Sequence, residues 1–197
     1  MVASSLSMKS NKLNIFETVL TCMLAVTLGV AFWGWTFIYE IFSPFLSGLG
    51  IKYLTAGPWL MAAMIPAFII RKPGVALASE TLAAVVQGFL ASWGLMSGAW
   101  GLVQGLGAEV VFLGLGYKRW NIWSLVLASM VSATFSYCLD IFYYNYRSLP
   151  IHINALQWFS FLISGAILCA LPTYLICQRL KKTGLLNNFR IVRGDNA

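Results

Sequence analysis

The sequence predicts an all-α integral membrane protein with six transmembrane helices and both termini in the cytoplasm, and three observations lead to that fold class. Hydrophobic residues form 59% of the 197-residue chain and charged residues only 10%, and the mean hydropathy is +0.78. A water-exposed surface could not absorb so many apolar side chains. The chain also divides into six apolar runs, and its basic residues gather in the breaks between them. We therefore expect residues 1–197 to form one six-helix, multi-pass membrane domain.

A helix that crosses a bilayer core about 30 Å thick needs about 20 apolar residues, and somewhat fewer inside a bundle. Six runs meet this requirement. They cover roughly residues 15–37, 55–70, 75–91, 99–116, 122–143 and 155–177. The first run follows basic residues, as the core of a signal peptide would, but it is too long and contains Glu17, so we expect it to be retained.

The breaks between the runs contain typical turn residues. Arg71-Lys72-Pro73-Gly74 separates the second run from the third, because proline stops a helix and glycine admits turn geometry. An uncharged loop over residues 92–98 leads into the Gly-rich fourth run, which Lys118-Arg119 closes. The fifth run starts at Ile122, and a basic segment at residues 179–182 follows the sixth.

The basic residues indicate the orientation, because six spans place both termini on one side. That side carries Lys9, Lys12, Arg71, Lys72, Lys118, Arg119, Arg179, Lys181, Lys182, Arg190 and Arg193, and the other side only Lys52 and Arg147. Such an excess marks the cytoplasmic side. We therefore attribute the net charge of +7 to contact with the lipid bilayer and not to nucleic-acid binding.

Several chemistries have no signal in the sequence. No GxxxxGK[ST] phosphate loop occurs, so the chain does not bind ATP in the P-loop manner. The four cysteines form no CxxC pair, and His152 is the single histidine. Clustered His, Asp or Glu side chains would be needed for catalysis or a metal. We expect neither an enzyme nor a metal or cofactor site.

Ionisable and amide side chains inside the runs need an explanation, because burying them in a membrane is costly. Glu80 and Glu109 lie in the third and fourth runs, with Gln87 and Gln104 nearer the outer side. One interpretation places all four in a ligand pocket. The other, which we favour for the glutamates, is that they brace the inner loops and pair with basic residues there. For the two glutamines both interpretations stay open.

Aromatic and acidic residues gather on the outer side. They are Trp33, Trp35, Tyr39, Glu40, Trp93, Trp100, Asp140, Tyr143, Tyr144 and Trp158. An interfacial belt of Trp and Tyr explains part of this set. Belts form at both interfaces, however, and only Trp120 and Trp123 of the eight tryptophans lie at the inner one. The excess predicts an aromatic cage for a planar or cationic ring, with Gln87 and Gln104 contributing hydrogen bonds.

Small residues recur at four-residue spacing on the first run, at Thr21, Ala25 and Gly29, and on the fourth run at Gly101 and Gly105. Such faces let helices approach closely. They either pack within this bundle or dock against another membrane subunit.

The motifs from Ile69 to Leu77 (IIRKPGVAL), Glu80 with Ala83-Ala84, and Val103 to Glu109 (VQGLGAE) resemble the YkoE family, together with the tail segment at residues 183–187. Members are substrate-binding (S) components of energy-coupling factor (ECF) vitamin transporters. The resemblance spans most of the chain. Gln87 departs from the family pattern, in which an acid is common; the amide keeps its hydrogen bonding but loses the charge.

The resemblance implies a bacterial cell-membrane protein that binds a vitamin with high affinity outside the cell and releases it inward. Thiamine or its hydroxymethylpyrimidine (HMP) precursor is the usual substrate, and cobalamin or a related corrinoid comes next. A transmembrane coupling subunit and two cytosolic ATPases would be its partners, with the face of Thr21, Ala25 and Gly29 as the coupling contact. The alternative is a stand-alone carrier or channel that uses Glu80 and Glu109 as a proton or cation relay.

Overall fold

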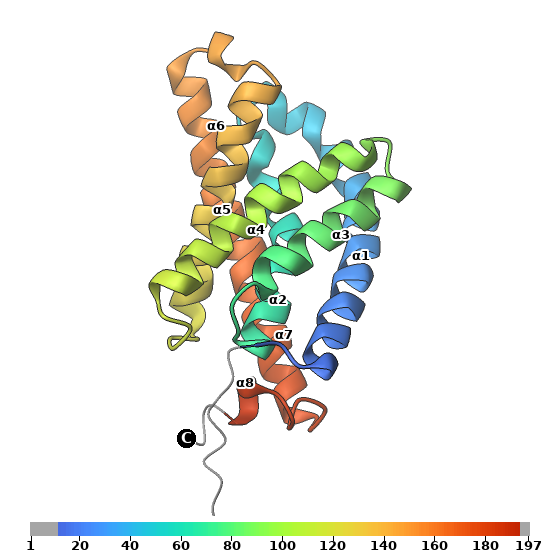
Figure 1. Cartoon of the computed structure of the whole chain (residues 1–197). Helices are drawn as coiled ribbons and strands as arrows, with labels where there is room; N and C mark the ends of the chain where they lie inside the picture. The colour runs from blue at the N-terminus through green and yellow to red at the C-terminus, as the bar shows by residue number, and fades with distance from the viewer. Residues whose placement is uncertain (1–11, 194–197) are drawn as a thin grey trace, which may run out of the picture.

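The computed structural model describes residues 12–193, and in this range every regular element is a helix (Figure 1). The helices are α1 (Ile15–Gly48), α2 (Met61–Ile70), α3 (Val75–Leu90), α4 (Ser97–Gly114), α5 (Ile122–Tyr143), α6 (Ile151–Ser164), α7 (Leu171–Lys182) and α8 (Arg190–Arg193). Two short 3-10 helices, η1 (Lys52–Thr55) and η2 (Gly57–Leu60), join α1 to α2. Lys9, which entered the topology argument, lies outside the described residues.

Four segments of the described chain are long and apolar enough to cross a membrane. They are Ile15–Gly48, Gly94–Gly114, Ile122–Tyr143 and Ile151–Lys182. The last is continuous through α6, the π-helical segment η5 (Gly165–Ala170) and α7. The prediction of an all-helical membrane protein is therefore confirmed. Gly57–Ile70 and Val75–Leu90 are shorter apolar helices, roughly 20–25 Å long at 1.5 Å per residue, so six crossings stay a prediction.

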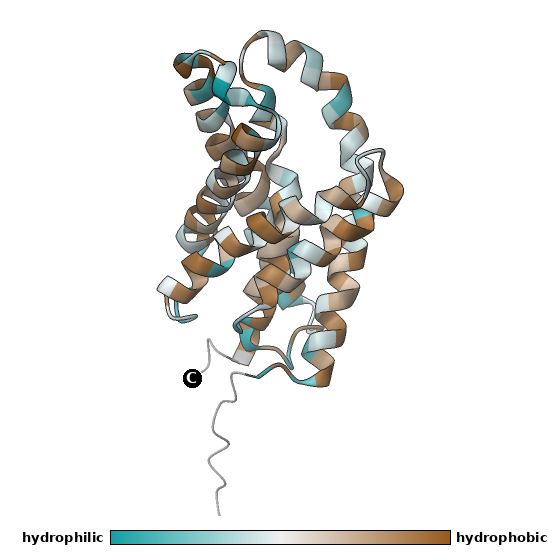
Figure 2. Cartoon of the chain, turned by 45° about the horizontal axis from the view of Figure 1, so that its top comes forward, coloured by the Kyte–Doolittle hydropathy of each residue, from teal (hydrophilic) through white to brown (hydrophobic). Residues whose placement is uncertain are grey.

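Helix α2 is short because it lies inside the bundle. All its residues from Ala62 to Ile70 are buried, and Met64 and Phe68 have no exposed surface. Helices α1, α3, α5 and α7 pack around it. A helix that is hydrophobic all round is typical of such a central position, whereas the outer helices carry their hydrophobic residues along their length and hydrophilic ones toward their ends (Figure 2).

The small face of α1 packs against α3. Thr21, Ala25 and Gly29 are all buried, and a Cβ at Gly29 would lie 2.6 Å from the carbonyl oxygen of Ala83. The two backbones touch here, which only glycine allows. Of the two interpretations left open for this face, packing within the bundle is therefore the one that the structure shows. The contact of this face with a coupling subunit stays a prediction, and in this structure α3 covers the face.

The turn between α2 and α3 lies at the same end of the bundle as the start of α1 and as α8 (Figure 1), and we call this the basic end. Arg71 adopts the left-handed conformation at the end of α2, and Gly74 does so at the start of α3. Lys72 Nζ forms an ion pair with Glu17 at 2.6 Å, and Arg190 donates to the carbonyl of Arg71 at 3.1 Å. The predicted turn is thus confirmed, and it ties α1 and the tail to the core.

Candidate functional site

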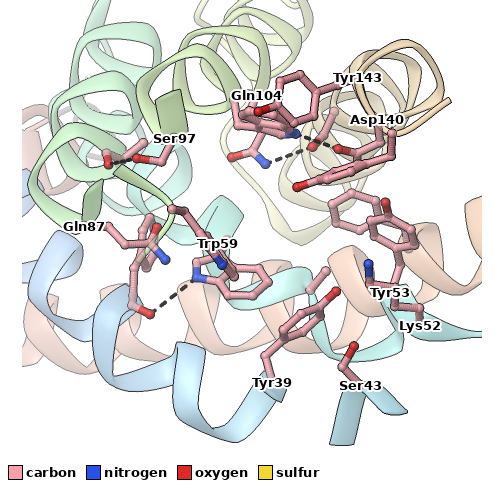
Figure 3. Close-up of a pocket in the computed structure, with 18 of the residues that line it drawn as sticks. Tyr39, Ser43, Lys52, Tyr53, Trp59, Gln87, Ser97, Gln104, Asp140 and Tyr143 are labelled. Carbon is pink, nitrogen blue, oxygen red and sulfur yellow. Dashed lines mark hydrogen bonds between the residues drawn. The ribbon is translucent and has the colours of Figure 1, made fainter. Parts of the chain in front are cut away.

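A cavity of about 550 Å³ opens at the other end of the bundle (Figure 3). Its walls come from the C-terminal halves of α1 and α5, from α3 and α6, from the start of α4 and the connection before it, and from the η1 and η2 segments. Nine aromatic side chains line it: Phe32, Tyr39, Tyr53, Trp59, Trp93, Trp100, Tyr143, Tyr144 and Phe161. The polar lining consists of Glu40, Ser43, Lys52, Glu80, Gln87, Ser97, Gln104, Ser136 and Asp140. A cavity of this size, in which aromatic and polar side chains line the walls in equal number, suits a small organic molecule that carries both flat rings and polar groups.

The first aromatic cluster consists of Tyr39 from α1, Trp59 from η2 and Trp93 from the loop after α3. Tyr39 meets Trp59 edge to face with ring centroids 4.7 Å apart, and Trp59 meets Trp93 at 5.2 Å. These contacts join three segments that are distant in sequence. Because edge-to-face packing fixes ring orientation, the cluster presents a stable apolar wall to the cavity.

The second aromatic cluster surrounds Asp140 on α5. Trp100 from α4 donates its Nε1 hydrogen to Asp140 Oδ1 at 2.6 Å and packs edge to face on Tyr143 at 4.7 Å. Tyr144 lies 5.0 Å from Tyr143. Asp140 is 3% exposed, and this hydrogen bond satisfies one of its carboxylate oxygens, so a buried acid is tolerated in an aromatic wall.

Two amide side chains are oriented by hydroxyl groups on neighbouring helices. Gln87 Nε2 donates to Thr36 Oγ1 at 3.1 Å, and Gln104 Nε2 donates to Ser136 Oγ at 2.9 Å. Both amides line the cavity and are labelled in Figure 3. Each amide keeps a second N–H hydrogen and its carbonyl oxygen, so each can both donate a hydrogen bond to a ligand and accept one from it.

Glu80 lies at the inner part of the cavity lining and is fully buried. Its Oε2 accepts a hydrogen bond from the backbone N–H of Ala63, in the first turn of α2. A helix start needs such an acceptor, because its first N–H groups have no partner within the helix. Glu80 Oε1 has no hydrogen-bond partner. The glutamate therefore braces the start of α2. The interpretation that we favoured, in which Glu80 braces an inner loop, is not what the structure shows.

Glu109 does brace the basic end, as we favoured. Its carboxylate accepts hydrogen bonds from the N–H groups of Gly74 at 2.6 Å, Ala76 at 3.1 Å and Leu77 at 3.3 Å, and also from the Tyr117 hydroxyl. Burial, together with this hydrogen bond to Glu109, raises the pKa of Tyr117. The partners of Glu109 are thus the backbone at the start of α3 and the Tyr117 hydroxyl. Lys72, a basic residue at the same end, forms its ion pair with Glu17 instead.

The comparisons with known proteins agree with one another. Residues 16–135 match the family described as the permease component of an ABC-type cobalt transport system. YkoE of Bacillus subtilis, named as an HMP/thiamine permease protein, is 32% identical over 185 residues, which cover 93% of this chain and 92% of YkoE. The crystal structure of an S component of an ECF transporter superposes with a TM-score of 0.85 at 31% identity, covering 94% of both chains.

The chain belongs to the YkoE-like family of ECF transporter S components. The resemblance seen in the sequence is thereby confirmed. Among the residues that the structure describes, no three His, Cys, Asp or Glu side chains cluster as metal ligands would.

This S component brings nine of its twelve sequence-predicted binding residues to the cavity. They are Tyr39, Glu40, Gln87, Trp93, Trp100, Gln104, Asp140, Tyr143 and Tyr144. Trp33 lies one residue past the buried Phe32 and faces outward, 37% exposed. Trp35 donates instead to the carbonyl of Thr55 at 2.8 Å, and Trp158 donates to Thr134 at 3.1 Å. Trp35 and Trp158 thus hold neighbouring segments together, and none of the three tryptophans lines the cavity.

The predicted set omitted Lys52, Tyr53 and Trp59 of the S component's cavity. Lys52 is one of only two Lys or Arg residues on the predicted outer side, and the topology argument treated it as an exception. That exception could have identified Lys52 as a cavity residue, because a basic residue that departs from the positive-inside pattern needs a local reason for its position. Tyr53 and Trp59 lie in η1 and η2, whose 3-10 geometry no hydrophobic periodicity reveals.

Proposed function

We propose that this S component captures thiamine or HMP in the cavity and delivers it into a bacterial cell. The observation that carries the proposal is a cavity of about 550 Å³ with two aromatic clusters and two oriented amides on its walls. Flat heteroaromatic rings stack on such walls, and their amino and ring-nitrogen groups find hydrogen-bond partners in the amides. The name of the B. subtilis relative, an HMP/thiamine permease, supports the same substrate class.

The family supports a proposal for the direction and the energy source of transport. We propose that the cavity faces the outside, because the Arg71–Lys72 turn and most other basic residues lie at the opposite end of the bundle. A transmembrane coupling subunit and two cytosolic ATPases would drive inward release, since the chain contains no phosphate-binding loop. No chemical change of the substrate is involved.

Cobalamin is the weaker candidate. The family description refers to cobalt transport, and cobalamin is the cobalt-containing vitamin. A corrinoid macrocycle is far larger than a pyrimidine ring, however, and the cavity volume of about 550 Å³ lies in the range of small drug-sized ligands.

Titration of the detergent-purified protein with thiamine, HMP and cobalamin tests the substrate. Tryptophan fluorescence reports binding of the first two, because Trp59, Trp93 and Trp100 line the cavity, and calorimetry serves for cobalamin. We expect a Kd below about 1 μM for thiamine or HMP. Absence of binding by protein that is monodisperse and unfolds cooperatively would contradict the proposal.

Uptake into proteoliposomes tests the coupling. We expect uptake only when the coupling subunit, both ATPases and ATP are present. Uptake by the S component alone would favour the stand-alone carrier instead. The structure lends that carrier little support, since Glu80 and Glu109 accept hydrogen bonds from the starts of two different helices.

A further inference from the structure

Lys52 places a positive charge in the cavity wall. Its Nζ lies 5.9 Å from the ring centroid of Tyr53 and 5.6 Å from that of Tyr144, and it donates to the Tyr146 hydroxyl at 3.3 Å. Figure 3 shows the side chain beside Tyr53, across the cavity from Gln87. An ammonium held against tyrosine rings in this way occupies the place that an aromatic cage offers to the cation of a ligand.

The segment that carries Lys52 is held on both sides. Trp35 of α1 donates to the carbonyl of Thr55 at 2.8 Å, and the ring of Tyr53 stacks on Phe161 of α6 at 5.1 Å. Tyr53 also meets Tyr137 of α5 edge to face at 5.4 Å. These contacts fix η1 to α1, α5 and α6. A small shift of the η1 backbone therefore does not carry the Lys52 ammonium out of the cavity.

No carboxylate neutralises Lys52 at short range. Within residues 12–193, no Asp or Glu oxygen lies within 4.0 Å of its Nζ, and its hydrogen bond goes to a neutral phenol. Burial lowers the pKa of Lys52, but the phenol groups of Tyr39 and Tyr146 raise it by more, so the net shift is upward. The side chain therefore stays charged at neutral pH.

The acids that line the cavity are engaged elsewhere or exposed. Asp140 Oδ1 accepts the hydrogen bond of Trp100 at 2.6 Å, and no ion pair joins Asp140 to Lys52 within the described residues. Glu80 is bound to the N–H of Ala63. Glu40 lies on the exposed side of α1, where water screens its charge. A ligand ring that stacks on Tyr53 or Tyr144 therefore lies beside the Lys52 ammonium, which is within 5.9 Å of both ring centroids.

We propose that Lys52 is a specificity-determining residue that makes the cavity prefer an uncharged heteroaromatic ring to a cationic one, so that HMP binds more tightly than thiamine. This inference rests on the proposed function. The two molecules share one pyrimidine ring, and thiamine adds a permanently cationic thiazolium. The thiazolium would be repelled by the fixed ammonium in a partly desolvated site, whereas a neutral ring can stack there, and its ring nitrogen or hydroxyl can accept a hydrogen bond from Lys52.

The test is the ratio of the Kd for thiamine to the Kd for HMP, measured by calorimetry in the wild type and three variants. We expect the wild-type ratio to exceed 1. Lys52→Met removes the charge but keeps an unbranched side chain, and should lower the ratio about tenfold, a conservative value for the loss of one charge repulsion in a partly screened site. Lys52→Arg keeps the charge and should retain the wild-type ratio.

Arg147→Met is the matched control. Arg147 is the other basic residue of the predicted outer side and also lies over an aromatic ring, 4.1 Å from the centroid of Phe142, but it does not line the cavity. Its loss should leave the ratio unchanged. An equal fall of the ratio in Arg147→Met would show a general surface-charge effect and would overturn the role of Lys52.

The outcomes separate this inference from the proposed function. If both molecules bind but the wild type prefers thiamine, or if Lys52→Met leaves the ratio unchanged in folded protein, the inference fails and the proposed function stands. If Lys52→Met does not fold, a lowered ratio in Lys52→Arg contradicts the inference on its own. If folded wild-type protein binds neither molecule, both the proposed function and the inference fail.

Discussion

At the scale of single residues, Asp140 shows how the cavity tolerates a buried acid. It is 3% exposed, and Trp100 donates to its Oδ1 at 2.6 Å. A buried carboxylate without a donor costs several kcal/mol. The same indole ring packs on Tyr143 and forms part of the cavity wall. Trp100 therefore joins α4 to α5 and shapes the cavity with one side chain.

Replacing Trp100 with phenylalanine separates these two roles. The ring remains, but Asp140 loses its donor, so we expect Kd for the preferred vitamin to rise about tenfold, the size of one charge-assisted hydrogen bond. Trp158→Phe is the control, because it also removes an indole hydrogen bond, to Thr134, but away from the cavity. Its Kd should change less than about twofold. Equal losses in the two variants would contradict the assignment of Trp100 to the binding wall.

Glu80 stabilises the start of α2 through one buried hydrogen bond. Its Oε2 accepts from the N–H of Ala63, and the side chain is fully buried. Glu80→Ala should lower the free energy of unfolding by about 1–3 kcal/mol, because it leaves a buried donor unsatisfied. Glu80→Gln should lower it by less, since an amide oxygen can accept the same hydrogen bond. Thermal unfolding in detergent measures both, and a larger loss in the glutamine variant would contradict this role.

At the scale of elements, the close contact of α1 with α3 depends on Gly29. A Cβ there would meet the carbonyl of Ala83 and the side chain of Val86. Gly29→Leu should therefore lower the free energy of unfolding by about 3 kcal/mol or more, since backbone cannot move aside as a flexible side chain can. Gly34 on the same helix has open space around it, and Gly34→Leu should change stability by less than about 0.5 kcal/mol. Similar melting temperatures in the two variants would contradict the packing role of this face.

The cap that Glu109 provides for α3 is the second prediction at this scale. Glu109→Ala removes the acceptor of three backbone N–H groups and should lower the free energy of unfolding by about 1–2 kcal/mol. Hydrogen exchange should become faster at Gly74, Ala76 and Leu77. Glu109→Gln keeps one acceptor oxygen and should lie between the wild type and Glu109→Ala. Unchanged exchange at these three amides would contradict the capping role.

The sequence predicted elements better than it predicted their roles. The fifth run, 122–143, coincides with α5 (Ile122–Tyr143) because it starts after an Asn121 cap and is predominantly apolar along its length. The first run was cut short at 37, whereas α1 continues to Gly48. The reason is functional: Tyr39, Glu40 and Ser43 line the cavity, and polar residues that face a cavity look like a helix end in a hydropathy pattern. The small face of α1 was ambiguous because close packing within a bundle and between subunits uses the same residues.

At the scale of the whole molecule, the chain has two chemically different ends. The basic end holds the Lys72–Glu17 ion pair and the Arg190–Arg71 contact, and the other end holds the cavity. An S component that collects a vitamin from outside must open its cavity away from the cytoplasm. The positive-inside distribution predicts the same orientation from basic residues that take no part in the cavity. The prediction from charge is therefore independent of the requirement that the cavity capture an external vitamin.

Labelling with a membrane-impermeant maleimide tests this orientation. Ser148 at the cavity end and Thr183 at the basic end are both exposed hydroxyl residues, so Ser148→Cys and Thr183→Cys form a matched pair. In intact cells the reagent should label Ser148→Cys, whereas Thr183→Cys should react only after permeabilisation, because the cluster of basic residues holds its end in the cytoplasm. The wild type controls for the native cysteines, of which Cys169 and Cys177 are buried. The reverse pattern would place the cavity in the cytoplasm, where it could not capture an external vitamin, and would overturn the proposed direction of transport.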